Sequence, residues 1–159
     1  METGFLLPDL EGEDTAEFWA GCARGELLVQ ACARCGRWRF PPRPMCPHCR
    51  SIAFGWVPVS GRATIWSFVV PHPPLLPAYA ELAPYNVVVV ALEEDPTIRM
   101  VGNLVEDARG PINAIDPATI RIGEPVRVVF APVEDVALPR WVRAGDNPRP
   151  DPGGKGRAQ

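Results

Sequence analysis

The sequence of 159 residues predicts a mainly β protein with a short N-terminal helix, a metal-binding ribbon and a small barrel. Three observations indicate this fold class. Two Cys-x-x-Cys pairs stand close together, short apolar runs with turn signals follow them, and helical periodicity is confined to the N-terminus. We divide the chain into a helical segment (1–26), a ribbon (27–55), a barrel (56–143) and a tail expected to be disordered (144–159).

The first periodic segment predicts a short helix that runs to Arg24, with Asp14 or Thr15 as its N-cap. Phe18-Trp19 and Cys22 fall on one face of this helix. We therefore expect the helix to dock on an apolar surface, with Cys22 as a buried thiol rather than a nucleophile.

The two Cys-x-x-Cys pairs are Cys32 with Cys35 and Cys46 with Cys49, and together they match a four-thiolate metal site. Each such turn can place two sulfurs on one side of a tetrahedral Zn²⁺. The residues between the pairs read as a short strand and a return loop, as in a zinc ribbon. A disulfide pair would suit a secreted chain, and a redox motif needs only one pair. We expect one structural Zn²⁺, although the spacing alone leaves iron open.

Beyond the cysteines the chain reads as β-strands. Residues 56–70 read as one long strand, sharply coiled at Gly61. Residues 85–92 read as a strand whose unbroken apolar run, Val87 to Leu92, is typical of a strand covered on both faces, and 97–105 can pair with it. Further strands are expected at 126–130 and 133–138. Five strands of this length suit a closed barrel of the OB type, because about 90 residues is thin for a sandwich.

A proline-rich segment, residues 71–79, lies between two of these strands. Its prolines predict an extended, stiff loop with few backbone donors. Leu75, Leu76 and Tyr79 have no evident place in a small barrel already filled by Val and Ile. We therefore expect these three side chains to form a partner interface, the alternative being that the loop plugs the barrel mouth.

Charge is distributed unevenly along the chain. The net charge is −3, which argues weakly against a general nucleic-acid binder. From Cys32 to Ala80 there are six arginines and no acidic residue, so this part can meet phosphates or an acidic protein surface. Solvated arginines that serve solubility are the alternative. The paired thiolates and the absence of a signal or membrane-spanning run predict a cytoplasmic protein without membrane contact.

Catalytic motifs are missing from the sequence. His48 lies inside a knuckle whose metal already has four sulfurs, and His72 has no neighbouring Ser, Cys or carboxylate to activate or orient. There is no phosphate-binding glycine loop and no nucleophile elbow. These absences favour a binding or accessory role over an enzyme in its own right.

Taken together, these motifs resemble the acyl-CoA-associated zinc-ribbon/OB-fold family, long catalogued as a domain of unknown function. The resemblance covers about residues 17–143. The matching segments are Phe18-Trp19, Gly25-Glu26-Leu27, Cys32-x-x-Cys35-Gly36, Phe40-Pro41-Pro42-Arg43-Pro44-x-Cys46-Pro47-x-Cys49, Val59-Ser60-Gly61-Arg62-Ala63-Thr64-Ile65, Pro84-Tyr85-Asn86-Val87-Val88 and Ile122-Gly123-Glu124-Pro125-Val126. Asn86, and Asp95 where the hairpin turn usually offers glycine, are minor departures from the pattern.

The resemblance implies a rubredoxin-like ribbon, an OB barrel and no catalytic residue in this chain. Members are similar in partnering thiolase-superfamily enzymes, which include thiolases, acyltransferases and aldol lyases of steroid side-chain CoA thioesters. The thiolase-like subunit carries the catalysis, and the small protein stabilises it and helps to form the acyl-CoA entrance. A CoA thioester would thus be bound jointly with the partner. The candidates to contact its phosphates are Arg34, Arg37, Arg39 and Arg43.

The rival interpretation is a free-standing single-stranded nucleic-acid binder. An OB groove for single strands needs aromatic platforms interleaved with basic residues. Trp66 and Phe68 share a predicted strand, but the strands after Tyr85 offer almost no exposed aromatic candidate. The apolar character of those strands favours contact with protein.

Overall fold

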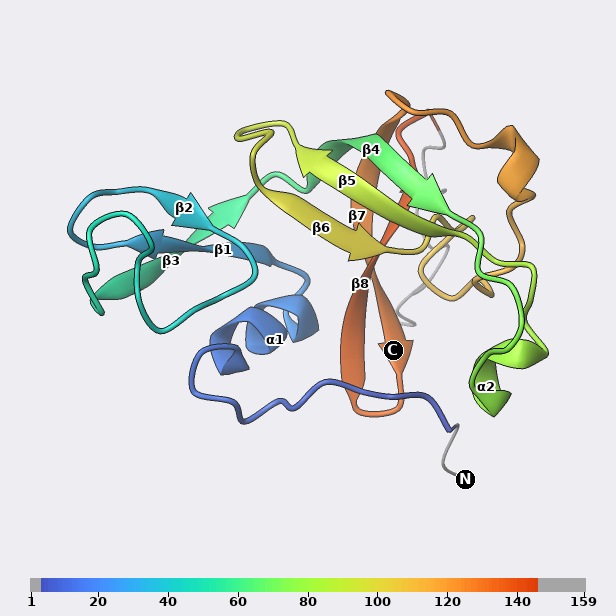
Figure 1. Ribbon diagram of the computed structural model, residues 1–159, viewed down its shortest axis with the longest axis horizontal. Helices are drawn as coiled ribbons and strands as arrows, with labels where there is room; N and C mark the ends of the chain where they lie inside the picture. Colours follow the sequence, from blue (N-terminus) through green and yellow to red (C-terminus); the bar gives the residue numbers. More distant parts are fainter. Residues whose placement is uncertain (1–3, 146–159) are drawn as a thin grey trace, which may run out of the picture.

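The computed structural model describes residues 4–145 and contains two antiparallel sheets that lie side by side (Figure 1). A three-stranded ribbon sheet has the order β2-β1-β3, and a five-stranded sheet has the order β6-β5-β4-β7-β8. The helices and strands are α1 (Ala16–Ala23), β1 (Leu27–Cys32), β2 (Trp38–Arg39), β3 (Phe54–Val59), β4 (Arg62–Val69), α2 (Pro77–Ala80), β5 (Val87–Leu92), β6 (Arg99–Gly102), η1 (Pro117–Thr119), β7 (Pro125–Val133) and β8 (Val136–Arg143).

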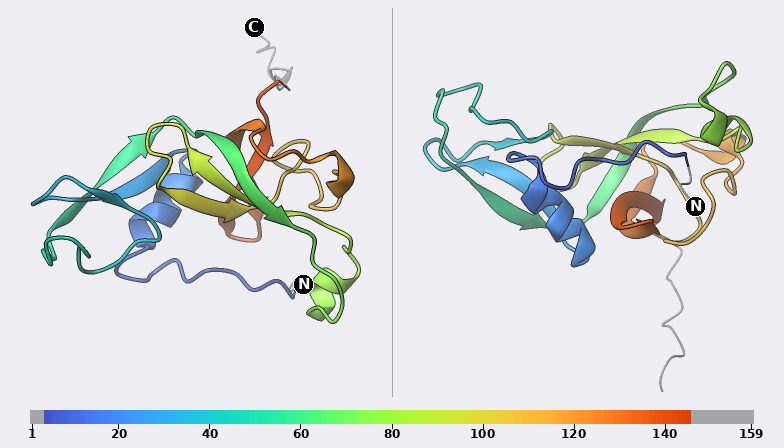
Figure 2. Two further views of the ribbon diagram at one scale, coloured as in Figure 1. Left: turned by 45° about the horizontal axis from the view of Figure 1, so that its top comes forward. Right: turned by 90° about the horizontal axis from the view of Figure 1, so that it is seen from below.

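The five-stranded sheet curls around the main core, which confirms the predicted OB-type architecture (Figure 2). Its inner face carries the side chains expected from strand alternation, such as Ile65, Val88 and Val90. Trp141 of β8 is fully buried among them. Beyond β6 the chain bridges to β8 at Leu104, so the two edges of the curled sheet approach each other. The inner side of the curled sheet is packed with apolar side chains.

Asn86, the polar residue at the start of the apolar run, has a clear structural purpose. Its side chain is fully buried, accepts a hydrogen bond from the Leu104 N–H at 2.7 Å and donates to the Leu104 carbonyl at 2.9 Å. An amide side chain can satisfy both backbone groups in this way, as a neighbouring strand would. It therefore ties the chain after β6 to the start of β5.

Helix α1 packs where the two sheets meet, and contacts β1 and β8. Phe18 and Cys22 are buried in the main core, as the apolar stripe predicted. Thr15 is the N-cap, but its side chain makes no capping hydrogen bond. The helix ends at Ala23, with Arg24 as the C-cap and Gly25 in the left-handed region.

The expectation of one coiled strand over residues 56–70 is wrong. The chain forms two strands there, and they belong to different sheets. β3 pairs with β1 in full register, from Leu27 opposite Val59 to Cys32 opposite Phe54. Gly61 has a φ of +76°, which most residues avoid, and it forms the sharp turn between the end of β3 and the start of β4.

Two other expectations need correction. The last strand begins at Val136 and runs to Arg143, because Val133 ends β7 and Glu134-Asp135 form the turn of the hairpin between the two strands. The proline-rich segment is not extended throughout, since Pro77 starts the short helix α2. Most of the predicted disordered tail, residues 146–159, lies outside the described residues. Within residues 4–145 no helix is long and apolar enough to cross a membrane.

Candidate functional site

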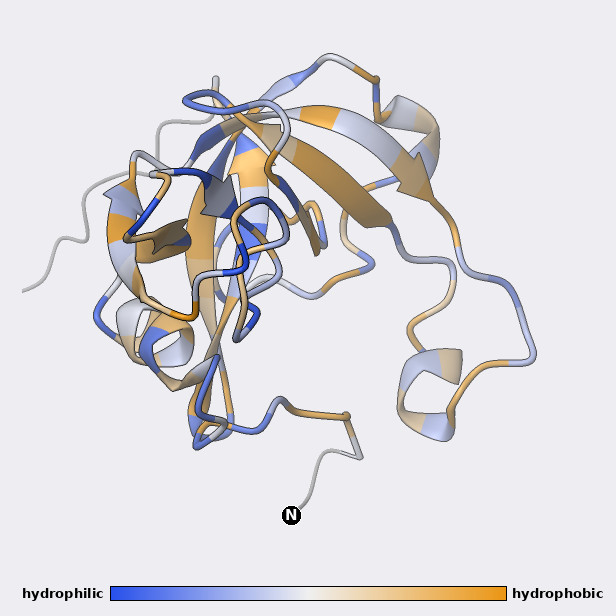
Figure 3. Ribbon diagram, turned by 60° about the vertical axis from the view of Figure 1, so that its left-hand side comes forward, coloured by the Kyte–Doolittle hydropathy of each residue, from blue (hydrophilic) through white to orange (hydrophobic). Residues whose placement is uncertain are grey.

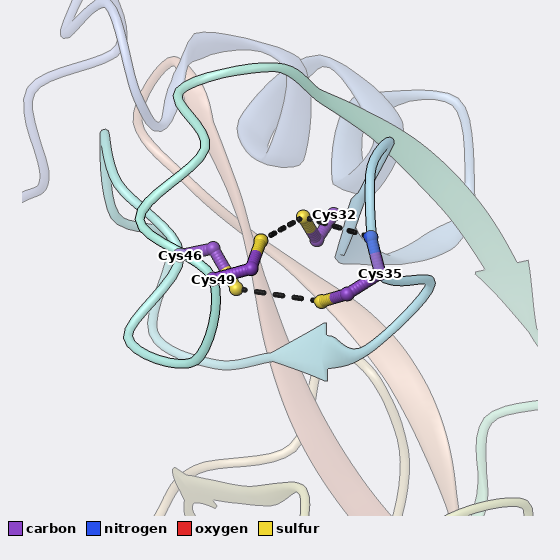
Figure 4. Close-up of side chains that lie close together, drawn as sticks. All are labelled: Cys32, Cys35, Cys46 and Cys49. Atoms are coloured by element: carbon purple, nitrogen blue, oxygen red, sulfur yellow. Dashed lines mark hydrogen bonds between the residues drawn. The ribbon is translucent and has the colours of Figure 1, made fainter.

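The four cysteines of the paired motifs meet at the end of the ribbon sheet (Figure 4). Their Sγ atoms all lie within 4.8 Å of one another. The closest approaches run between the two knuckles, with Cys32 Sγ 3.5 Å from Cys49 Sγ and Cys35 Sγ 3.7 Å from Cys46 Sγ. Four sulfurs around a tetrahedral zinc with bonds of about 2.3 Å stand roughly 3.8 Å apart, so this arrangement fits the metal.

The backbone of the two knuckles follows one plan. In each, a turn closes between the first cysteine and the residue after the second, from Gly36 N–H to Cys32 O at 3.0 Å and from Arg50 N–H to Cys46 O at 2.9 Å. Gly36 and Arg50 both have positive φ, of 72° and 59°. This equivalence is the pseudo-symmetry that lets two short turns present their sulfurs to one ion.

Backbone N–H groups of the knuckles favour the thiolate form of the first cysteine in each pair. The Cys35 N–H lies 3.5 Å from Cys32 Sγ and lowers the pKa of the Cys32 thiol to about 6, against burial, which raises it. The Cys49 N–H likewise lowers the pKa of the Cys46 thiol. Thiolates are the form that binds zinc, so the fold prepares the site for a metal.

The sulfur distances also decide between the alternatives for these cysteines. A disulfide needs an S–S distance of about 2.05 Å, and none of these pairs approaches it. A redox motif would use one pair, whereas here both pairs converge on a common point. The site is a structural zinc centre, closed by four protein ligands, which organises the ribbon and leaves no open position for a substrate.

The four candidate CoA-binding arginines do not share one environment. Arg34, Arg37 and Arg43 are exposed on the ribbon, and Arg37 Nη1 lies 2.9 Å from Nε2 of the exposed His48. Arg39 is instead 7% exposed. The three exposed arginines can meet a ligand in solvent, whereas the side chain of Arg39 is enclosed by the protein.

Arg39 holds the return loop of the ribbon to β1. Its Nε donates to Gln30 Oε1 at 2.5 Å, its Nη2 donates to the Arg43 carbonyl at 3.1 Å, and its guanidinium lies 5.6 Å from the Phe54 ring centroid. Gln30 Oε1 also accepts from the Arg43 N–H at 2.9 Å. A buried cation needs such partners. This network sets the path of the loop that leads to Cys46.

The proline-rich segment divides its three candidate interface side chains. Leu75 and Tyr79 are half-buried against a second apolar cluster that contains Tyr85. The Tyr79 ring lies between those of Phe5 and Tyr85, with centroids 5.0 and 6.0 Å away. Leu76 points outward and is 52% exposed.

An apolar surface that the sequence reasoning missed covers the outside of strands β4, β5 and β6. We call it the outer sheet face, and it consists of Trp66, Val69, Val87, Val89, Arg99 and Val101. Val69 and Val101 are 59% and 62% exposed, and the Arg99 guanidinium stacks 3.7 Å above the centroid of the half-exposed Trp66 ring. Strand alternation predicts which residues point outward, and Figure 3 shows the apolar residues along the curled sheet. Only the tertiary structure shows that Trp66, Val69 and Val101 stay exposed, while Val87 packs against the second apolar cluster.

The directions of the two aromatic side chains on β4 show whether they could stack together on nucleic-acid bases. A register shift lies between Ile65 and Ser67 of β4, so the chain carries one extra residue there. Trp66 points outward, as alternation from the buried Ile65 requires, whereas the extra residue brings Phe68 opposite Val88 and against the main core. The two aromatic rings therefore do not form a shared stacking platform for bases.

The remaining candidates for chemistry are unpromising in the structure. Cys22 is 1% exposed, and burial raises the pKa of its thiol to about 12, so it is not a nucleophile at neutral pH. His72 is exposed on the proline-rich segment. The geometry thus assigns a structural metal and binding surfaces to this chain.

The zinc ribbon followed by a curled OB sheet defines the class of protein, and comparisons give the family. Residues 19–54 match the family described as "ChsH2, rubredoxin-like zinc ribbon domain", and residues 56–131 match "ChsH2, C-terminal OB-fold domain". The chain belongs to this ChsH2-like DUF35 family, as the sequence motifs predicted.

Two named proteins from other organisms are similar in sequence to this chain. It is 39% identical over 141 residues to the Mycobacterium tuberculosis 3-oxo-4,17-pregnadiene-20-carboxyl-CoA hydratase alpha subunit, covering 89% of this chain and 41% of that protein. The chain therefore spans less than half the length of this relative. A "DUF35 domain-containing scaffold protein" of Methanothermobacter thermautotrophicus is 33% identical over 113 residues, covering 70% of this chain and 77% of that protein.

A solved structure is also similar over nearly its whole length. A chain of the "Ltp2-ChsH2(DUF35) aldolase" matches with a TM-score of 0.71 and 33% sequence identity, covering 86% of this chain and 99% of that chain. A second solved structure, a DUF35 protein of unknown function from Sulfolobus solfataricus, has a TM-score of 0.55 and 14% identity and supports the fold alone.

Proposed function

We propose that this chain is a non-catalytic accessory subunit of a CoA-dependent enzyme of the thiolase superfamily, such as a thiolase, an acyltransferase or an aldol lyase of steroid side chains. The observation that carries the proposal is the likeness to the DUF35 chain of the Ltp2-ChsH2 aldolase, over 99% of that chain at 33% identity. The scaffold name of an archaeal relative supports it. The setting we propose is the cytoplasm, where zinc thiolates are kept reduced.

The proposed ligand is an acyl-CoA bound jointly with the partner subunit. CoA carries phosphate groups that the guanidinium groups of arginine recognise. Arg34, Arg37 and Arg43 are exposed on the ribbon, and the chain has no acidic residue from Cys32 to Ala80. Arg39 would act indirectly, because its hydrogen bonds to Gln30 and Arg43 fix the loop from which Arg43 projects. The name of the mycobacterial relative, a steroid-type acyl-CoA hydratase subunit, makes a bulky acyl group our preferred substrate class.

The proposed partner interface combines Leu76 with the outer sheet face. β4 leads directly from this face into the proline-rich segment that carries Leu76, so the two surfaces are continuous along the chain. Exposed apolar area of this kind on one side of a protein marks a partner site. Leu75 and Tyr79 would support the interface from below, since both pack inward against the second apolar cluster.

Co-purification of variants with the proposed thiolase-like partner subunit tests the interface. We expect Leu76→Asp to weaken assembly about tenfold or more, because a carboxylate would be desolvated at the contact. The melting temperature should stay nearly unchanged, since Leu76 is 52% exposed. Ile122→Asp, at a 68% exposed residue before β7, is the matched control and should assemble normally. A large fall in the melting temperature of Leu76→Asp with intact assembly would instead identify Leu76 as a plug of the barrel.

A further inference from the structure

A cavity of about 310 Å³ lies apart from the zinc centre and from the proposed CoA-binding arginines. It is enclosed by the N-terminal segment, by α2, by the loop after β6 and by the β7–β8 hairpin, and the N-terminal segment runs across this region beside α2 (Figures 1 and 2). Its wall is mostly apolar and includes Phe5, Leu6, Leu7, Tyr79, Leu82 and Leu138. Its size is at the lower end of the range for small-molecule pockets, about 300–1,000 Å³.

Two arginines stand in the wall of this apolar cavity. Arg140 of β8 is half-buried, and its Nη1 donates a hydrogen bond to the Gly110 carbonyl at 3.3 Å. Tyr79 lines the same cavity. Arg109 is exposed beside Arg140 in the same wall. A guanidinium has five donors, so one carbonyl leaves most of those of Arg140 available.

The positive charge of Arg140 has no anionic partner in the described part of the chain. No Asp or Glu lines the cavity, and none of the ion pairs among residues 4–145 involves Arg109 or Arg140. Burial lowers the pKa of Arg140 from its ordinary value, which expresses the unfavourable desolvation of this charge. An anion that reached the cavity would offset that cost and would find two guanidinium groups and a hydroxyl.

We infer that this cavity binds a small carboxylate with an apolar body, of the medium-chain fatty acid type. The carboxylate would accept hydrogen bonds from Arg140 and Arg109, while the alkyl chain would lie against the leucines and Phe5. A neutral amphiphile of the same length would gain only the apolar contacts. The site lies in this chain alone, so the inference does not depend on the proposed accessory function.

Isothermal titration calorimetry of the full zinc-loaded chain tests this inference, with decanoate and decanol as matched probes below the concentrations at which they aggregate. We expect decanoate to bind more tightly than decanol. Arg140→Gln should weaken decanoate binding about tenfold or more, because it removes a hydrogen bond to a charged group, and should leave decanol binding unchanged. Leu138→Trp should fill the cavity and reduce the binding of both probes.

Arg99→Gln is the control for a general effect of positive charge, since Arg99 lies on the outer sheet face and contacts Trp66 instead of the cavity. It should bind decanoate like the unaltered chain. Three results would each overturn the inference: no binding of decanoate to the unaltered chain, equal affinity for decanoate and decanol, or equal weakening by Arg99→Gln and Arg140→Gln. Binding that survives Leu138→Trp would likewise show that decanoate binds elsewhere.

Discussion

At the scale of single residues, two glycines with positive φ occupy sharp turns, Gly61 between β3 and β4 and Gly123 before β7. Gly61 combines a φ of +76° with close packing, because a Cβ added there would overlap Cγ1 of Val128 in β7. Gly123 has a φ of +87°, but a Cβ added there would meet nothing within 4 Å. The two positions therefore separate backbone strain from steric overlap.

We expect Gly123→Ala to lower the free energy of unfolding by about 1–2 kcal/mol, the cost of a left-handed conformation for a residue with a Cβ. Gly61→Ala should lower the free energy of unfolding by about 1–3 kcal/mol more than Gly123→Ala does, because its methyl group also displaces Val128. Urea denaturation of both variants, with zinc bound throughout, gives the two values. Equal losses at the two positions would contradict the steric part of this account.

Residues whose role depends on local spacing were predictable, and those whose role depends on distant neighbours were not. The four zinc ligands follow from two turns of fixed length. Arg39 looked like its neighbouring arginines in the sequence, yet it is buried, because Gln30 on another strand and Phe54 beyond the second knuckle surround it. No pattern along residues 34–43 contains that information.

At the scale of the elements, the ribbon depends on its metal. The main core is formed mostly by the curled sheet and α1, with Leu27 and Val29 of β1 reaching into it, whereas the far end of the ribbon has only one two-residue strand and the cysteine turns. Metal binding to such a small unit contributes directly to its folding. Removing zinc should therefore unfold the ribbon before the barrel.

Alkylation of cysteines should follow this order. In the native zinc-loaded chain we expect iodoacetamide to modify none of the five cysteines within the time that modifies a free thiol. A strong chelator should expose the four ligands, and Cys22 should react only in denaturant, since it is 1% exposed and its pKa is raised to about 12. Intact-mass measurement counts the added groups, and elemental analysis identifies the metal.

Two outcomes would contradict this account of the ribbon. Four cysteines that react only after reduction would show disulfides, and early modification of Cys22 would show that α1 is not docked as described. Chelation that adds no alkyl groups would mean that the thiolates do not depend on a metal.

The elements themselves were predicted better than their membership in sheets. The apolar run at 87–92 was correctly expected to be a strand, and it forms β5, the second strand of the curled sheet. The expectation that both of its faces are covered was too strong, because Val87 and Val89 are only half-buried. β3 was assigned to the barrel because it precedes β4 closely in sequence. It belongs to the ribbon sheet, since its register with β1 is a long-range property. The extra residue in β4, which turns Phe68 inward, is equally invisible to a simple alternation of apolar and polar residues.

At the scale of the whole molecule, the features of residues 4–145 that bear on function are the four converging cysteines, the exposed apolar side chains and the arginines of the ribbon. Four sulfurs converge at the end of the ribbon, and apolar side chains fill the inner side of the curled sheet. Exposed apolar side chains lie on the outer sheet face and at Leu76, and others are scattered at Leu6, Met45, Ile52 and Ile122. The arginines of the ribbon stand at the opposite end of the molecule from the cavity beside α2 (Figure 1). This distribution fits a subunit that contributes contacts to an enzyme whose reacting groups lie elsewhere.

The most direct test of this account is acyl-CoA turnover measured for three samples at equal concentration: this chain alone, the thiolase-like subunit alone, and the two expressed together. We predict that this chain alone turns over no acyl-CoA, that the two form a stable complex on size exclusion, and that the complex is more active than the thiolase-like subunit alone. Turnover by this chain alone that is lost in His72→Ala would contradict the account. So would a thiolase-like subunit that is fully active without this chain and does not bind it.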